Sequence, residues 1–127
     1  MKRILAAAAL AIGLQTSAGA EDMQDWTLVI HGGAGVLERE KMTPEIDAEQ
    51  RRALEAALKA GRGVLANGGT AIDAVEAAIV ILEDHPGFNA GHGAVFNAGG
   101  SIELDAALMD GSNRDAGAVA GITKTRN

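Results

Sequence analysis

The hydrophobic pattern of this chain changes its period once, at Pro86-Gly87, and this change restricts the folds open to it. Before that point apolar residues recur every three or four positions, which predicts amphipathic helices. In residues 102–109 apolar side chains fall on alternate positions, which predicts a strand. Proline and glycine at the boundary prevent a helix from continuing. We therefore expect an α+β fold in which helices precede most of the strands.

Two helices are predicted before this boundary, separated by Asn67-Gly68-Gly69. Thr43-Pro44 marks the start of the first, because threonine is a common N-cap and proline is favoured at the first helical position. Thr70 marks the start of the second, because Asp73 follows it at the spacing of a capping box, and this helix should end near Glu83. The residues expected to face the core are Leu54, Ala57, Leu58, Gly61 and Leu65 in the first helix, and Ile72, Val75, Ile79 and Leu82 in the second.

Three further segments are predicted to be strands. Residues 26–30 form a β-branched and aliphatic run that stops at a glycine turn, as a buried strand would. Residues 94–97 are expected to pair with residues 102–109 across a turn at residues 98–101. Residues 116–122 are small and apolar, which is typical of a strand buried on both faces. The predicted order is one strand, two helices and three strands.

The first twenty residues have the pattern of an export signal. Met1-Lys2-Arg3 is a short basic start, residues 4–14 are uncharged and apolar, and Ala18-Gly19-Ala20 fits the signal peptidase site. The apolar run is much shorter than the roughly 20 residues that span a bilayer. We therefore expect a signal peptide at residues 1–20, export, residence in the periplasm, and no membrane anchor.

The mature domain, residues 21–127, should be acidic and poor in aromatic side chains. The whole chain has a net charge of −6, with one Trp, two Phe and no Tyr. We expect no nucleic-acid partner, because such domains need basic surface and stacking platforms. The sequence contains no cysteine, so no disulfide or thiol nucleophile is available. Asp47 with Arg51, and Glu55 with Lys59, stand four residues apart and should pair on the solvent face of the first helix.

Two glycine-rich stretches could carry chemistry. His31-Gly32-Gly33-Ala34-Gly35 lacks the glycine and lysine positions of dinucleotide- and phosphate-binding loops. Its amides could bind a small anion, but a close-packed turn explains the same residues more simply. Residues 82–93 follow a helix end and are rich in glycine, so their carbonyl groups could hold a monovalent cation. A helix cap followed by a tight connector is the alternative, and spacing alone favours it.

Four segments of the sequence are more informative as an ordered series than any one of them is alone. In chain order they are His31-Gly32-Gly33-Ala34-Gly35, Phe88-Asn89-Ala90-Gly91-His92-Gly93-Ala94-Val95-Phe96-Asn97, Glu103-Leu104-Asp105-Ala106-Ala107-Leu108-Met109-Asp110-Gly111 and Gly117-Ala118-Val119-Ala120-Gly121. In order and spacing this series resembles the plant-type L-asparaginase family of N-terminal-nucleophile hydrolases, which includes the isoaspartyl peptidases. The resemblance covers roughly residues 28–127.

The resemblance implies an αββα sandwich of which residues 21–127 form only the amino-terminal part. It also implies a precursor that cuts itself ahead of a threonine, whose freed amine then serves as its own base. Members of the family hydrolyse the side-chain amide of L-asparagine and the β-linked bond of isoaspartyl dipeptides. No cofactor for catalysis is implied.

The resemblance assigns supporting roles to residues of this chain. Asn89 would help to position the nucleophile, and Gly32 and Gly33 would border the active site. A structural sodium ion would be held by main-chain oxygens of Leu82, Glu83, His85, Phe88, Ala90 and His92.

The family's Gly-Thr-Val cleavage site is not found in these 127 residues. Gly69-Thr70-Ala71 is similar, but Thr70 is better explained as a helix cap. No catalytic residue is therefore assigned here, and we expect the chain to be inactive without the β-subunit part, with a dimer of heterodimers as the complete assembly. The alternatives are a non-catalytic module that binds small anions and the related glycosylasparaginase activity.

Overall fold

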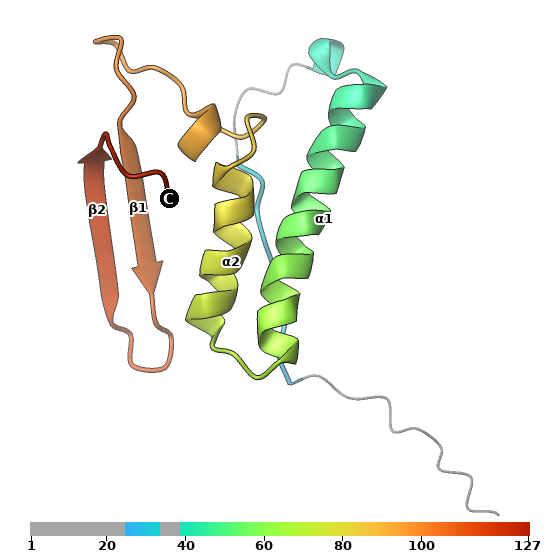
Figure 1. The fold of residues 1–127 in the computed structure, drawn as a ribbon, viewed down its shortest axis with the longest axis vertical. Helices are drawn as coiled ribbons and strands as arrows, with labels where there is room; N and C mark the ends of the chain where they lie inside the picture. Colours follow the sequence, from blue (N-terminus) through green and yellow to red (C-terminus); the bar gives the residue numbers. More distant parts are fainter. Residues whose placement is uncertain (1–24, 34–38) are drawn as a thin grey trace, which may run out of the picture.

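The computed structural model describes residues 25–33 and 39–127, so the predicted signal peptide lies outside the described residues. The helices and strands within the described ranges are η1 (Arg39–Lys41), α1 (Pro44–Ala66), α2 (Ala71–Glu83), η2 (Gly91–Gly93), β1 (Leu104–Met109) and β2 (Ala116–Ile122), where η denotes a 3-10 helix. Figure 1 shows α2 between α1 and the strand pair. The predicted α+β class is confirmed for this part of the chain.

Helix α1 begins and ends where its local sequence predicts. The Thr43 side chain accepts a hydrogen bond from the Ile46 N–H (3.3 Å), and Pro44 occupies the first turn. At the other end, the Asn67 N–H donates to carbonyl groups of the last turn, and its side chain donates to the Gly63 carbonyl at 2.7 Å. Gly68 then turns the chain with a φ of +78°, a conformation that glycine adopts without strain.

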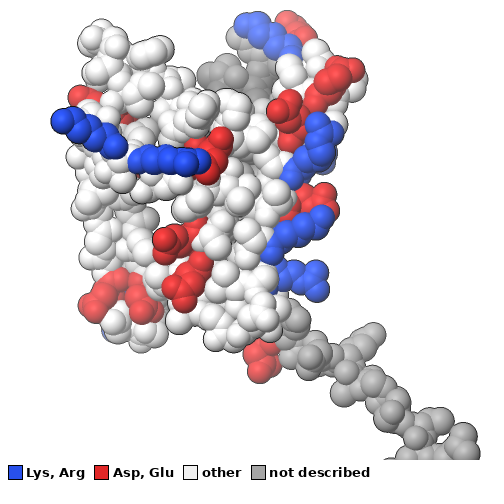
Figure 2. All heavy atoms as spheres, in the orientation of Figure 1, with Lys and Arg blue, Asp and Glu red and all other residues white. Residues whose placement is uncertain are grey.

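The solvent face of α1 carries the predicted ion pairs. Arg51 Nε lies 2.7 Å from Asp47 Oδ2, and Lys59 Nζ lies 2.7 Å from Glu55 Oε1. Figure 2 shows acidic and basic side chains interleaved along the edge of the molecule that α1 forms. Charges of alternating sign at this spacing stabilise an exposed helix face.

Helix α2 starts with the predicted capping box. The Thr70 hydroxyl oxygen accepts the Asp73 N–H at 3.1 Å, while the Asp73 carboxylate accepts the Thr70 N–H at 3.3 Å. These reciprocal bonds satisfy backbone donors that the first turn leaves free, a contribution of about 1 kcal/mol. Thr70 therefore acts as a helix cap, as predicted.

Small side chains form the contact between α1 and α2. The buried positions are Ala53, Ala57 and Gly61 in α1 and Ala74, Ala78 and Leu82 in α2. Each set repeats every four residues and so forms one ridge along its helix. Small residues in both ridges allow the two backbones to approach closely.

The core-facing stripes predicted for the two helices are partly wrong. Leu58 in α1 is 39% exposed, and Val75 and Ile79 in α2 are 44% and 43% exposed. Helix α2 is apolar on more than one face, so hydrophobic period alone could not select the face that meets α1. The small face packs against α1, and the bulkier side chains remain at the surface of the described residues. No helix in the described ranges is long and apolar enough to cross a membrane.

Residues 26–30 are extended but form no ladder within the described part of the chain, so the predicted strand is not observed there. Trp26, Leu28 and Ile30 are half-buried, while Thr27 and Val29 are exposed, which is the alternation of a strand. The segment runs alongside the helix pair (Figure 1), and Ile30 packs against the core. The segment is thus not fully buried as expected, and no described segment lies beside it as a hydrogen-bonded partner.

Strands β1 and β2 form an antiparallel hairpin, with Leu104 opposite Ile122 and Met109 opposite Ala116. The register is interrupted between Leu104 and Ala106. Within this irregularity, Gly121 has a φ of +67° and donates its N–H to the Asp105 carboxylate at 2.9 Å. Both strands were predicted, although β1 begins two residues later than expected.

The partner predicted for β1 is wrong. Residues 94–97 form no strand within the described ranges, although the turn after them exists. Asn97 organises that turn, because its side-chain oxygen accepts the N–H groups of Gly99 (2.9 Å) and Ser101 (3.0 Å). Burial of β2 on both faces is also not observed, since only Ile122 of this strand is half-buried. With two strands in the described sheet, each strand has a free edge and no described element covers β2.

Candidate functional site

An open hollow of about 460 Å³ brings together residues that are more than fifty positions apart in the sequence. It lies where the glycine turn, helix α2 and the following loop meet. Its lining is His31, Gly32, Gly33, Gln50, Ile79, Leu82, Gly87, Phe88, Asn89 and Ala90. The three residues expected beside the active site, Gly32, Gly33 and Asn89, therefore share one hollow.

The glycine turn is packed directly on the core. A β carbon at Gly32 would lie 3.2 Å from a methyl carbon of Leu54 and 3.4 Å from the Phe88 ring. Gly33 has a φ of +97°, and its N–H donates to His31 Nδ1 at 3.1 Å. Because that amide is already engaged, the geometry argues against an anion site at Gly33, although the space beside this glycine is open. Ala34 and Gly35 lie outside the described residues.

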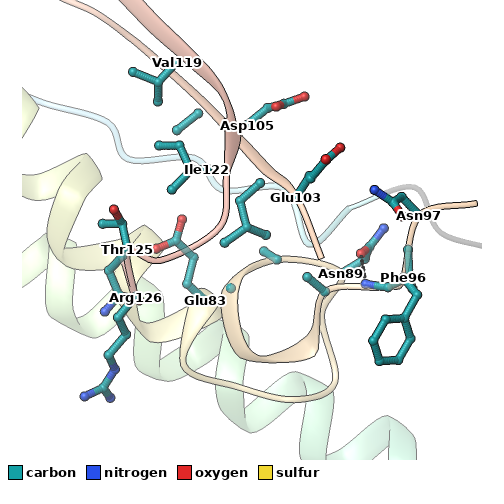
Figure 3. A pocket seen from close by; sticks show the side chains of 17 residues that line it. Glu83, Asn89, Phe96, Asn97, Glu103, Asp105, Val119, Ile122, Thr125 and Arg126 are labelled. Atoms are coloured by element: carbon teal, nitrogen blue, oxygen red, sulfur yellow. Dashed lines mark hydrogen bonds between the residues drawn. The ribbon is translucent and has the colours of Figure 1, made fainter. Parts of the chain in front are cut away.

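Asn89 lies between this hollow and a second one. Its side-chain oxygen accepts the Val95 N–H at 3.0 Å (Figure 3), which fixes the direction of the amide group. The side chain is exposed and contributes to the lining of both hollows. A polar group held in this way can present its remaining donors to a neighbouring group or to substrate.

The loop after α2 arranges a series of main-chain oxygens. Backbone N–H groups of His85, Phe88 and Ala90 donate to the carbonyls of Leu82 (3.2 Å), His85 (3.3 Å) and Phe88 (2.9 Å), respectively. The Ala90 carbonyl accepts from the Gly93 N–H at 3.0 Å. Each carbonyl oxygen has two lone pairs, so those of His85, Phe88 and Ala90 retain one acceptor position, whereas the Leu82 carbonyl also accepts from the Asp84 N–H.

Two glycines leave room for main-chain oxygens of this loop. A β carbon at Gly91, which has a φ of +48°, would lie 2.5 Å from the Glu83 carbonyl oxygen. A β carbon at Gly93 would overlap the Phe88 carbonyl oxygen and lie 2.6 Å from that of Pro86. The loop is thus a cradle of oxygens that side chains at these positions would fill. Hard cations take such ligands.

Side chains do not provide an alternative metal site in the described residues. No group of three or more histidine or acidic side chains there could hold a metal ion. His85 and His92 sit on the same loop, but His92 is exposed and His85 points toward α1. The groups of this loop that could hold a cation are therefore its main-chain carbonyls.

The second hollow, of about 440 Å³, separates the end of α2 from the hairpin. Figure 3 shows the Glu83 side chain extending from the end of α2 toward Ile122 and Thr125. Partial burial raises the pKa of the Glu83 carboxyl group, and the neighbouring Asp84 charge adds to this. The ionised form of Glu83 is thus disfavoured by the fold.

Sequence reasoning missed an ion pair at the edge of this hollow. Arg126 donates from Nε and Nη2 to the two Asp84 carboxylate oxygens, at 3.0 and 2.9 Å. The pair links the segment after β2 to the C-cap of α2, and two parallel bonds fix its geometry. The residues stand 42 positions apart, and neither belongs to a pattern that would have indicated the contact.

Comparison with known protein families gives a match. The family described as asparaginase matches residues 24–127 of this chain. The chain belongs to the asparaginase family. This confirms the family resemblance inferred from the glycine turn, the loop and the two strand segments.

Individual members of the asparaginase family are similar over the same region. The chain is 48% identical to an isoaspartyl peptidase/L-asparaginase of Xenopus laevis, 46% identical to a plant-type L-asparaginase of Pyrococcus furiosus and 44% identical to an isoaspartyl peptidase of Escherichia coli. Each alignment spans 100 residues, which is 79% of this chain and 31% of the relative. The chain thus spans about a third of the length of these asparaginase-family proteins.

Proposed function

We propose that the protein containing this chain hydrolyses the side-chain amide of L-asparagine and the β-aspartyl bond of isoaspartyl dipeptides. The observation that carries the proposal is the family match over residues 24–127, which includes every described residue of the candidate site. The names of the relatives support both activities, since they are called isoaspartyl peptidases and L-asparaginases. Both substrates present a carbonyl on the β carbon of an aspartyl unit, so one site can serve both.

The proposed nucleophile is the N-terminal threonine of a β-subunit part that is not among these 127 residues. Its hydroxyl oxygen would attack the amide carbonyl carbon while its own α-amine takes the proton. Ammonia or an amino acid would then leave, and water would release aspartate from the acyl-enzyme. The 127-residue chain would be inactive without that part, and the complete fold would be an αββα sandwich assembled as a dimer of heterodimers.

This chain would supply support for the nucleophile. The hydrogen bond to Val95 N–H holds the Asn89 amide at the rim of the hollow that also contains Gly32 and Gly33. Asn89 would position the threonine, while the two glycines leave room for close approach of the substrate. We propose no cofactor for the catalytic step.

The loop after α2 would hold a sodium ion through main-chain oxygens. The proposed ligands are the carbonyl groups of Leu82, Glu83, His85, Phe88, Ala90 and His92. The room that Gly91 and Gly93 leave beside the carbonyl oxygens of Glu83 and Phe88 supports this proposal. The ion would fix the shape of the loop that carries Asn89.

Export to the periplasm is also proposed, from the pattern of residues 1–20. Mass spectrometry of the protein purified from cells tests it. A mature chain that starts at Glu21 is expected. Recovery of a chain that still carries residues 1–20 from the cytoplasmic fraction would contradict it.

A panel of substrates tests the proposed activity and separates it from the alternatives. The full-length protein should release ammonia from L-asparagine and free amino acid from β-aspartyl dipeptides, whereas residues 21–127 alone should release neither. Hydrolysis confined to sugar-linked asparagine would indicate the glycosylasparaginase activity instead. Binding of phosphate or aspartate by residues 21–127, without hydrolysis by the full-length protein, would indicate a small-anion-binding module.

A further inference from the structure

The side chain of His85 is engaged on three sides, although only its main-chain oxygen belongs to the proposed cation site. It is 22% exposed and lies between α1 and the loop after α2. Its contacts are with Gly87, Glu49 and Phe88. These contacts involve the start of the loop, helix α1 and the core, respectively.

The first contact closes the start of the loop. His85 Nδ1 accepts the Gly87 N–H at 3.0 Å, two residues along the chain. A β carbon at Gly87 would lie 3.0 Å from both Nδ1 and Cε1 of this ring. Glycine at position 87 therefore allows the imidazole to lie directly against the backbone.

The second contact joins the loop to α1. His85 Nε2 lies 3.6 Å from Glu49 Oε1, which is an electrostatic contact rather than a hydrogen bond. Because Nδ1 accepts a hydrogen bond, the proton of the neutral ring belongs on Nε2 and faces the carboxylate. The imidazole thus spans from the loop backbone to a carboxylate on a rigid helix.

The third contact connects the ring to the core. The rings of His85 and Phe88 meet edge to face, with centroids 5.4 Å apart and an interplanar angle of 66°. Phe88 is a buried member of the core cluster and lines the hollow that contains Asn89. A displaced His85 ring would therefore remove an edge-to-face contact from Phe88, next to Asn89.

We propose that the His85 imidazole is a positioning residue that sets the shape of residues 85–90. It would hold the carbonyls of His85, Phe88 and Ala90 in the cation cradle and place Asn89 at the rim of the hollow. This inference rests on the proposed function, because the sodium ion in the loop and the role of Asn89 beside the nucleophile are both part of that proposal. His85 acts through the backbone and touches no reacting atom.

Matched variants separate the contributions of the two ring nitrogens of His85. His85→Asn keeps an acceptor near the position of Nδ1 and loses the contact with Glu49. His85→Ala loses both. Glu49→Ala removes only the helix partner, and Glu55→Ala is its control, because the Glu49 and Glu55 side chains on α1 are similarly exposed, at 60% and 62%, and Glu55 pairs with Lys59 instead.

The test measures the melting temperature of the full-length protein against NaCl concentration, with choline chloride at equal ionic strength as the reference. Loss of a hydrogen bond worth about 1.4 kcal/mol corresponds to a tenfold change in affinity. We expect the sodium midpoint to rise about tenfold in His85→Ala and by a smaller factor in His85→Asn and Glu49→Ala. Glu55→Ala should keep the wild-type midpoint.

Hydrogen exchange at the Gly87 amide supplies a second measurement. It should be faster in His85→Ala and near the wild-type rate in His85→Asn. A sodium-dependent wild type whose midpoint is unchanged in His85→Ala would overturn the positioning role and leave the cation cradle intact. A wild type that responds equally to sodium and choline would overturn the cradle, and the positioning role with it.

Discussion

Gly61 of α1 and the carbonyl group of Ala74 in α2 lie so close that no β carbon fits between them. A β carbon at Gly61 would lie 2.8 Å from the Ala74 oxygen and 2.7 Å from a methyl carbon of Leu28. This contact draws the helix pair and the N-terminal extended segment together at one point. It therefore sets the distance between α1 and α2, and the loop after α2 continues from this helix pair.

Substitution Gly61→Ala should destabilise the protein. Alanine raises helix propensity by about 1 kcal/mol, but overpacking against a backbone oxygen costs about 1–3 kcal/mol. We expect a net loss of up to about 2 kcal/mol in the free energy of unfolding, measured by urea denaturation of the full-length protein.

Gly63→Ala is the matched control, because a β carbon at Gly63 would meet nothing within 4 Å. This substitution should stabilise the protein by about 0.5–1 kcal/mol. The two glycines lie two positions apart in one helix, so opposite signs are expected. Equal effects of both substitutions would show that the close contact at Gly61 does not matter.

Thr70 should matter for stability and not for self-cleavage. Thr70→Ala removes the acceptor for the Asp73 N–H and should cost about 1 kcal/mol, whereas Thr70→Ser retains the cap. Denaturation measures the cost, and mass spectrometry of the purified protein follows cleavage. A product that begins at Thr70 would disprove the capping interpretation.

Asn89 should matter for activity more than for stability. Asn89→Ala leaves the Val95 N–H without its partner, but Val95 is 65% exposed, so water can replace the lost acceptor. We expect a melting temperature within about 3 °C of wild type, as for surface changes within about 0.5 kcal/mol.

The same substitution should lower kcat for β-aspartyl dipeptide hydrolysis at least tenfold, equal to about 1.4 kcal/mol in the barrier. Asn89→Asp, which keeps an acceptor for Val95, separates the local hydrogen bond from the role of the amide. Unchanged kcat in Asn89→Ala would remove Asn89 from the site.

Acid should weaken α1 through its two ion pairs. The hydrogen bond from Arg51 lowers the pKa of Asp47, and the hydrogen bond from Lys59 lowers the pKa of Glu55. A carboxyl group with a lowered folded-state pKa contributes stability above its unfolded pKa, about 3.9 for Asp and 4.3 for Glu, and loses it as the pH falls through the folded value.

Stability measured by denaturation should therefore fall more steeply below about pH 4.5 in the wild type than in the double variant Asp47→Asn, Glu55→Gln. High salt should reduce the difference, because both pairs are exposed to solvent. Parallel pH profiles for the two proteins would contradict this account of the pairs.

Helix boundaries could be predicted from the sequence because capping is local. Thr43, Thr70 and Asn67 make their capping contacts with residues no more than four positions away. The buried face of α2 could not be predicted in the same way, because Val75 and Ile79 are as apolar as the residues that face α1. The choice depends on which side chains allow close approach of another helix.

Strand pairing also lay beyond local reasoning. Residues 94–97 and β2 lie equally far from β1 in sequence, yet only β2 forms the ladder. Asn97 holds the connecting turn through its own side chain, and no described ladder extends from it. The juxtaposition of Gly32 and Asn89 depends on the packing of α1, α2 and Phe88, so among sequence arguments only family resemblance could indicate it.

The most direct test of the proposed function is the rate at which the purified full-length protein releases ammonia from L-asparagine and free amino acid from a β-aspartyl dipeptide. The account predicts hydrolysis of both substrates and none of the corresponding α-aspartyl dipeptide. A folded, mature protein that hydrolyses neither substrate above the rate of a heat-denatured sample would contradict it.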